Sequence, residues 1–220
     1  MRYLSACFIG EGRTDRCLAQ LGIRVAEWIL TREGRDQVEI GTPEIVQSPD
    51  RRLEAITSAA KEAMAFHDLL LLHADGKGDP DRAFRERVHP VFERLRGETD
   101  LVGKGFVGVV PVHETEAWLL ADGVALRVVF GTRRTAKDLG LPTAPAGVES
   151  LPDPKNALRE AQRRALGGRG RPRRNLDLPY QLIAATVDLA ALRRLSAFRR
   201  FEADLREALA ALGLLAGQLG

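Results

Sequence analysis

The chain of 220 residues has few cysteines and lacks a long apolar run. Cys7 and Cys17 form neither a CxxC nor a Cys/His spacing, so buried reduced thiols are expected rather than structural zinc. No stretch approaches the roughly 20 apolar residues of a membrane span. The apolar run near the N-terminus is too short for a secretory signal and leads directly into charged residues. These absences predict a cytoplasmic protein without a membrane partner.

Aromatic residues make up only 5% of the chain, while hydrophobic residues reach 45%, which is typical of a globular core of Leu, Ala and Val. The net charge is only +3, but a basic segment between residues 159 and 174 contains a single acid, Glu160. Its arginines can bind phosphates through charge and forked hydrogen bonds, and glycines lie among them. This predicts nucleic-acid contact, with a solvated charge run as the alternative. The residues expected to bind nucleic acid are Arg169, Arg171, Arg173 and Arg174.

Strand and helix patterns alternate through the first half of the chain, which predicts an α/β fold with a mostly parallel central sheet and helices on both faces. The run at 69–72 is wholly apolar, as expected for a central buried strand. Thr14 is the expected N-cap of the first helix, and Pro90 is expected to kink the third. Expected strands cover residues 2–9, 38–46, 69–72 and 106–112, and expected helices cover 14–34, 50–66 and 81–96.

The composition changes after Asp122. Residues 131–155 are rich in Gly, Pro, Thr and Ala, and helical patterns follow at 158–166, 180–185 and 188–212. We therefore expect an α/β core at residues 1–125 and a loop-rich, helical C-terminal portion at 126–220 that packs on it.

Acidic residues follow the expected strands: Glu11 follows the first, Asp75 the apolar one, and Glu114 with Glu116 the last. The carboxyl ends of parallel strands line the crevice where ligands bind, so these acids are expected to share one cleft. Carboxylate oxygens are ligands that Mg²⁺ prefers, and such ions activate water and hold phosphoryl groups. Gly10 and Gly12 are expected to leave the Glu11 carboxylate unobstructed. A solvated turn acid is the alternative for Glu11 taken alone.

The segment HADGKGD after the apolar strand adds further candidates. Asp75 and Asp79 are expected to face a ligand at the sheet edge, and a polar loop is the alternative. His73 at the strand exit is a candidate metal ligand or general base, with a hydrogen-bonded structural histidine as the equal alternative. Glu114 and Glu116 also fit the first turn of a helix, where acids favour its dipole. One of them is expected to bind metal while the other orients the site.

Several segments together resemble the bacterial DUF4276 family, whose fold looks like the Toprim fold. They are EGRTD, the acid after LLLL, PVHETEAWLLAD, DPKNAL and DLAALRRLSAFRRFEADL, and they span nearly the whole chain. The WLLAD and SAFRRF segments are the most specific, whereas EGxTD is widespread among Toprim-like proteins such as overcoming-lysogenization-defect nucleases. The resemblance implies a Mg²⁺-dependent, nuclease-like site and association with an ATPase in phage defence.

By this resemblance Glu11 matches the Toprim glutamate and Asp75 the second acid of its DxD motif. His73 stands where the first acid would be, which leaves less negative charge for two divalent ions and favours Mn²⁺ or a single metal. Lys155 in DPKNAL is a candidate phosphate contact, with a surface lysine as the alternative. Asp79 joins Glu11, Asp75, Glu114 and Glu116 in the expected metal set.

The sequence thus predicts a metal-dependent nuclease or phosphoesterase that uses Mg²⁺ or Mn²⁺. The rival is a non-catalytic accessory subunit that binds nucleic acid or an ATPase, and the replaced first acid favours it. A homodimer is left open, as is the choice between DNA and RNA.

Overall fold

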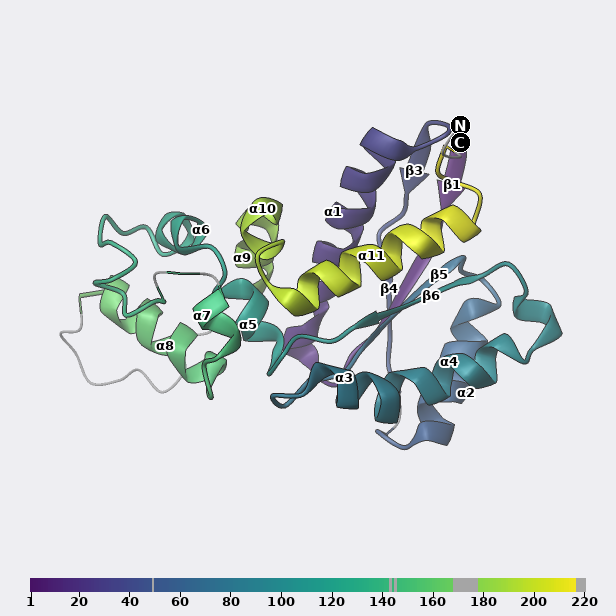
Figure 1. The fold of residues 1–220 in the computed structure, drawn as a ribbon, viewed down its shortest axis with the longest axis horizontal. Coiled ribbons are helices and arrows are strands. Elements are labelled where there is room, and N and C mark those ends of the chain that lie inside the picture. Colours follow the sequence, from purple (N-terminus) through teal and green to yellow (C-terminus); the bar gives the residue numbers. More distant parts are fainter. Residues whose placement is uncertain (49, 143, 145, 168–177, 217–220) are drawn as a thin grey trace. The chain divides into compact units, whose positions relative to one another are not determined.

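A computed structural model describes residues 1–48, 50–142, 144, 146–167 and 178–216 (Figure 1). The chain forms two compact units. The first comprises Met1–Ala74, Asp81–Val110 and Arg200–Gly220, and the second comprises Asp75–Pro80 and Pro111–Arg199. The units interleave along the chain, and the expected boundary near residue 125 stays a prediction. Arg169, Arg171, Arg173 and Arg174 lie outside the described residues.

The first unit contains a parallel sheet of four strands in the order β4-β2-β5-β6, which confirms the α/β fold expected from the sequence. These strands are β2 (Ala6–Ile9), β4 (Glu44–Val46), β5 (Leu69–His73) and β6 (Gly105–Val109). In the register Phe8 lies beside Leu71, and Leu71 lies beside Val107. A second parallel pair joins β1 (Arg2–Leu4) to β3 (Val38–Ile40).

Helices cover both faces of the sheet. The side chains of β2 and β5 alternate between the two faces, and they are buried on both. On one face, Cys7 and Leu70 pack in a core that also holds Met64 of α2 (Leu53–Met64) and Phe92 of α4 (His89–Arg96). The other face packs against α1 (Arg16–Glu33) and α11 (Ser196–Ala211). Gly22 of α1 lies so close to Leu71 that a Cβ there would be 2.6 Å from its side chain. Figure 1 shows α1 and α11 on one side of the strands and α2 with α4 on the other.

Several expected elements differ from the structure in detail. The expected strand at 2–9 is two strands, β1 and β2, which belong to different sheets. The expected strand at 38–46 is two strands, β3 and β4, with Pro43 between them. Thr14 does not cap α1: it lies within a 3-10 turn, η1 (Arg13–Asp15), and Asp15 precedes the helix. Pro90 lies in α4 directly after a π-helical turn, η2 (Phe84–Val88), which follows α3 (Pro80–Ala83). Proline has no N–H to bond the preceding turn, so a wider turn at this point is the local response.

The second unit is built from short helices around Trp118, which is 1% exposed and packs edge-on against Phe198 at a centroid distance of 5.2 Å. Its helices are α5 (Thr115–Leu119), α6 (Gly123–Val129), α7 (Ala146–Glu149), α8 (Pro154–Ala165), α9 (Tyr180–Thr186) and α10 (Leu189–Leu192). A further 3-10 turn, η3 (Thr99–Leu101), belongs to the first unit. No helix in the described ranges is long and apolar enough to cross a membrane.

Candidate functional site

The first candidate site lies where the strand order reverses. From β2 the chain moves to β4 on one side of the sheet, and it later returns to β5 on the other side of β2. Where the strand order reverses, the carboxyl ends of the two neighbouring parallel strands form the crevice in which an open α/β sheet usually binds its ligand. Glu11 follows β2 and His73 ends β5, so both lie at this point.

The turn after β2 is held by Asp15. Its Oδ2 accepts hydrogen bonds from the backbone N–H groups of Glu11 at 3.0 Å and Gly12 at 2.7 Å. Glycine is required at residue 10, because a Cβ there would lie 2.7 Å from the Phe8 ring. The turn therefore fixes where the Glu11 side chain leaves the backbone.

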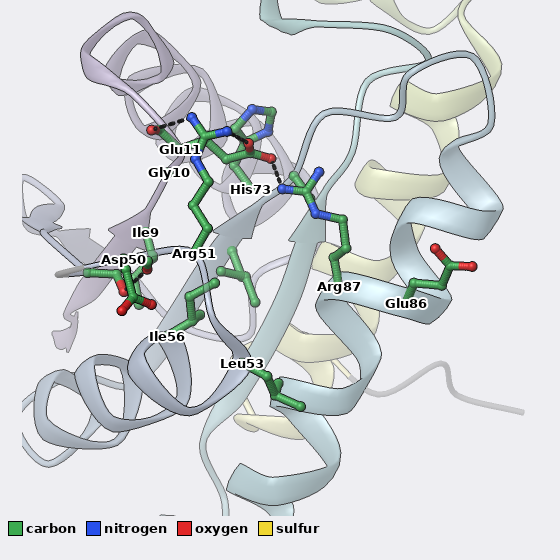
Figure 2. A pocket seen from close by; sticks show the side chains of 13 residues that line it. Ile9, Gly10, Glu11, Asp50, Arg51, Leu53, Ile56, His73, Glu86 and Arg87 are labelled. Atoms are coloured by element: carbon green, nitrogen blue, oxygen red, sulfur yellow. Dashed lines mark hydrogen bonds and ion pairs between the residues drawn. The ribbon is translucent and has the colours of Figure 1, made fainter.

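The Glu11 carboxylate is not unobstructed, contrary to the expectation from its flanking glycines. It forms ion pairs with Arg87, on the π-helical turn η2, and with Arg51 at 3.2 Å (Figure 2). The Glu11 side chain is only 10% exposed, so two guanidinium groups compensate a largely buried charge. Sequence reasoning missed both arginines, because nothing in the local pattern predicts the π-helical turn that carries Arg87 beside the crevice.

His73 is anchored in the sheet. Its fully buried ring places Nδ1 2.7 Å from the Val109 carbonyl oxygen, and Nε2 lies 3.7 Å from Asp15 Oδ2. The carbonyl can only accept, so Nδ1 carries a proton and Nε2 faces the carboxylate. The Phe8 ring stacks alongside at an interplanar angle of 14°. These contacts match the structural histidine that the sequence left as an alternative, and they link β5 to the turn that positions Glu11.

A pocket of about 290 Å³ in the first unit is lined in part by Glu11, Arg51, His73 and Arg87. Figure 2 shows Arg51 and Arg87 converging on Glu11, while Glu86, on the same turn as Arg87, points away. Glu86 instead pairs with Arg82 at 2.9 Å. At Glu11 the pocket thus combines a carboxylate with two cations that suit phosphate oxygens.

The second unit holds the remaining acidic candidates. Its loop at 75–80 is bound to the segment after β6: Gly76 N–H donates to the Pro111 carbonyl at 3.1 Å, and Gly78 N–H donates to the Val112 carbonyl at 2.7 Å. A Cβ on Gly76 would lie 2.2 Å from that Pro111 oxygen, so only glycine permits this approach. The bonding keeps Asp75 near the start of α5, where Glu114 is the N-cap residue.

Glu114 and Glu116 have different surroundings. Glu116 is buried, accepts a hydrogen bond from the Tyr180 hydroxyl at 2.5 Å and lies 3.8 Å from Lys155 Nζ. Glu114 Oε2 is buried without a hydrogen-bond partner in the described chain. Burial, followed by the charges of Glu116 and Asp75, raises the pKa of Glu114. Three carboxylates of one unit therefore repel each other, and Lys155 offsets only part of the repulsion.

The predicted site residues thus fall into two groups. Glu11 and His73 belong to the first unit, and Asp75, Asp79, Glu114, Glu116 and Lys155 belong to the second. Among the described residues, no group of three or more Asp, Glu, His or Cys side chains has an arrangement that could hold a metal ion. The cleft shared by Glu11, Asp75 and Glu114 or Glu116 stays a prediction.

Comparison with known proteins gives no further assignment. No family model matches the chain, and neither the curated proteins nor the solved structures contain a match.

Proposed function

We propose that the protein is a metal-dependent phosphodiester hydrolase acting on nucleic acid, with Mg²⁺ or Mn²⁺ as its cofactor. The observation that carries the proposal is the carboxylate cluster of the second unit, in which Glu114 has a raised pKa and a buried oxygen without a hydrogen-bond partner in the described chain. Carboxylate oxygens fit a hard divalent cation, and a cation would remove the repulsion among Asp75, Glu114 and Glu116.

When bound, a divalent ion supplies an activated water and charge stabilisation at a phosphoryl group. Asp75 and Glu114 are the residues that would hold it. Glu116 is fixed by Tyr180 and Lys155 and orients the start of α5. In the first unit, Glu11 is the candidate base, and Arg51 with Arg87 are candidates for binding phosphate oxygens.

A second function is favoured by a different observation. Arg51 and Arg87 already compensate the Glu11 carboxylate, and His73 is bound to the backbone of Val109. Such paired charges and a structural histidine are sufficient for a protein that binds nucleic acid or an ATPase without cleaving it. Phage defence with an ATPase partner rests on the family resemblance alone.

Replacing Glu114 with Gln tests the carboxylate cluster. Because the pKa of Glu114 is raised in the folded protein, its contribution to stability is present below the ordinary value of 4.5 and is lost as the pH rises through the folded value. Glu114→Gln should therefore gain stability over the wild type as the pH rises above that range. It should also lose part of the thermal stabilisation that Mg²⁺ or Mn²⁺ gives the wild type.

Thermal unfolding between pH 4 and 8, with and without each ion, measures both effects. Glu149→Gln is the matched control, since Glu149 belongs to the same unit but accepts hydrogen bonds from Ser196 and Ala197. Equal ion-induced stabilisation of the wild type and Glu114→Gln would count against a metal at this cluster.

The basic segment gives a separate prediction about nucleic acid. Replacing Arg171, Arg173 and Arg174 with Ala should weaken binding of DNA or RNA and flatten its dependence on salt, because fewer counterions are released. Fluorescence anisotropy at several salt concentrations measures the slope. Replacing Arg32, Arg35 and Arg52 with Ala removes the same charge elsewhere and serves as the control. A slope that the first triple variant leaves unchanged would remove the segment from the interface.

A further inference from the structure

The sheet has an open edge at β6. This strand is last in the order β4-β2-β5-β6, so no strand of the described chain lies on its outer side. Gly105 N–H donates to the Asp68 carbonyl, and the Val109 carbonyl accepts from Ala74 N–H, so these two residues face β5. Consecutive residues of a parallel strand direct their backbone groups to opposite edges. Phe106 and Gly108 therefore present N–H and C=O groups to the open edge.

A groove of about 560 Å³ lies along this edge, within the first unit. It is lined by Phe106 and Gly108 of β6, by Phe92 of α4 and by Ala208 of α11. Figure 1 shows β6 between these two helices. Proteins usually protect an edge strand with a charged residue, a proline or a bulge, whereas the sequence of β6 is GFVGV. The edge is thus suited to pairing with another extended segment.

The charges of the groove are not balanced. Each basic side chain that lines it already has an acidic partner: Arg96 pairs with Glu93 at 3.2 Å, Lys104 pairs with Asp68 at 3.3 Å, and Arg200 pairs with Asp81.

Asp204 and Glu207, both on the α11 side, form no ion pair within the described chain. Burial raises the pKa of Asp204, and the charge of Arg200 offsets only part of that effect. The uncompensated charge of the groove is therefore negative and lies on one wall.

We propose that this groove binds an extended peptide segment of a partner protein, which adds to β6 as a further strand and places Lys or Arg side chains against Asp204 and Glu207. Side chains of an added strand alternate between the two faces of the sheet. Every second residue would then face the acidic α11 wall, and the residues between would face Phe92 on the α4 side. The recognised sequence alternates basic and apolar residues. This surface is independent of the proposed metal chemistry.

A labelled hexapeptide of alternating Lys and Val is the probe, and fluorescence anisotropy against the full chain is the measurement. The wild type should bind it, and the double variant Asp204→Asn/Glu207→Gln should bind at least about 10-fold more weakly, a loss of roughly 1.4 kcal/mol. The control Glu27→Gln/Glu39→Gln removes two exposed acids from α1 and β3 and should bind like the wild type. Equal binding by the two double variants would overturn the proposal.

A second peptide separates strand addition from simple charge attraction. N-methylation of alternate residues removes the backbone donors along one edge while keeping every Lys charge. This peptide should lose most of the affinity. Equal affinity for the two peptides, or no binding of the unmodified one up to about 1 mM, would overturn the proposal. A wild-type dimer in sedimentation that fails to bind the hexapeptide would also overturn it, because a second copy would then occupy the edge.

Discussion

Glu11→Gln should lower divalent-dependent cleavage of nucleic acid by at least about 100-fold, which corresponds to ~2.7 kcal/mol of activation free energy. Glu11 lies at the reversal of the strand order, where a ligand is expected to bind, and its carboxylate is held by Arg51 and Arg87. Gln keeps the shape and can still accept a hydrogen bond from either guanidinium group, but it cannot supply charge or accept a proton. Single-turnover cleavage of labelled DNA and RNA measures the loss.

Glu86→Gln is the matched control, since Glu86 lines the same pocket but pairs with Arg82 and points away from Glu11. It should cleave like the wild type. Melting temperatures should show that both variants fold, although Glu11→Gln weakens two ion pairs and is expected to cost about 1 kcal/mol. Cleavage by Glu11→Gln at the wild-type rate would remove Glu11 from the chemistry.

Gly76→Ala should have the largest effect on the second unit. The added Cβ would lie 2.2 Å from the Pro111 carbonyl oxygen and 2.5 Å from the Val112 oxygen, so the loop at 75–80 would have to move. We expect a loss of about 2–3 kcal/mol in the free energy of unfolding and loss of the stabilisation by divalent ions, because Asp75 would shift away from Glu114. Denaturant unfolding with and without Mn²⁺ measures both quantities.

Gly78→Ala is the control in the same loop. Gly78 has a φ of +91°, but a Cβ there would meet nothing nearer than 3.4 Å. Its substitution should cost about 1 kcal/mol through backbone strain alone and keep the response to Mn²⁺. A full Mn²⁺ response in Gly76→Ala would show that the position of Asp75 beside Glu114 does not matter.

The sheet was predictable because its signal is local. The run at 69–72 is apolar throughout and becomes β5, the strand buried between β2 and β6. Alternation of strands and helices likewise gave the parallel sheet. The split of the strand at 38–46 and the π-helical turn before Pro90 were not foreseen, since both depend on how the chain meets its neighbours in space.

The site was less predictable than the sheet. The spacing of acids after strands predicts one cleft shared by Glu11, Asp75 and Glu114 or Glu116, and this stays a prediction. The structure has Glu11 in the first unit and the other acids in the second, where the charges of Asp75 and Glu116 act on Glu114. Arg51 and Arg87 were missed, because each reaches Glu11 from an element distant in the sequence. Asp15 had a usable signal, as an acid four residues after Glu11 in a glycine-rich turn is suited to accept that turn's N–H groups.

The proposed hydrolase activity is tested most directly by cleavage of single-stranded DNA, double-stranded DNA and RNA by the purified wild type. The protein is titrated with Mg²⁺ and with Mn²⁺, and binding is followed in parallel. We predict cleavage of at least one substrate that rises to saturation with the ion, stops on chelation and is lost in Glu11→Gln. Binding of nucleic acid without cleavage at any concentration of either ion would contradict it and favour the accessory-subunit alternative.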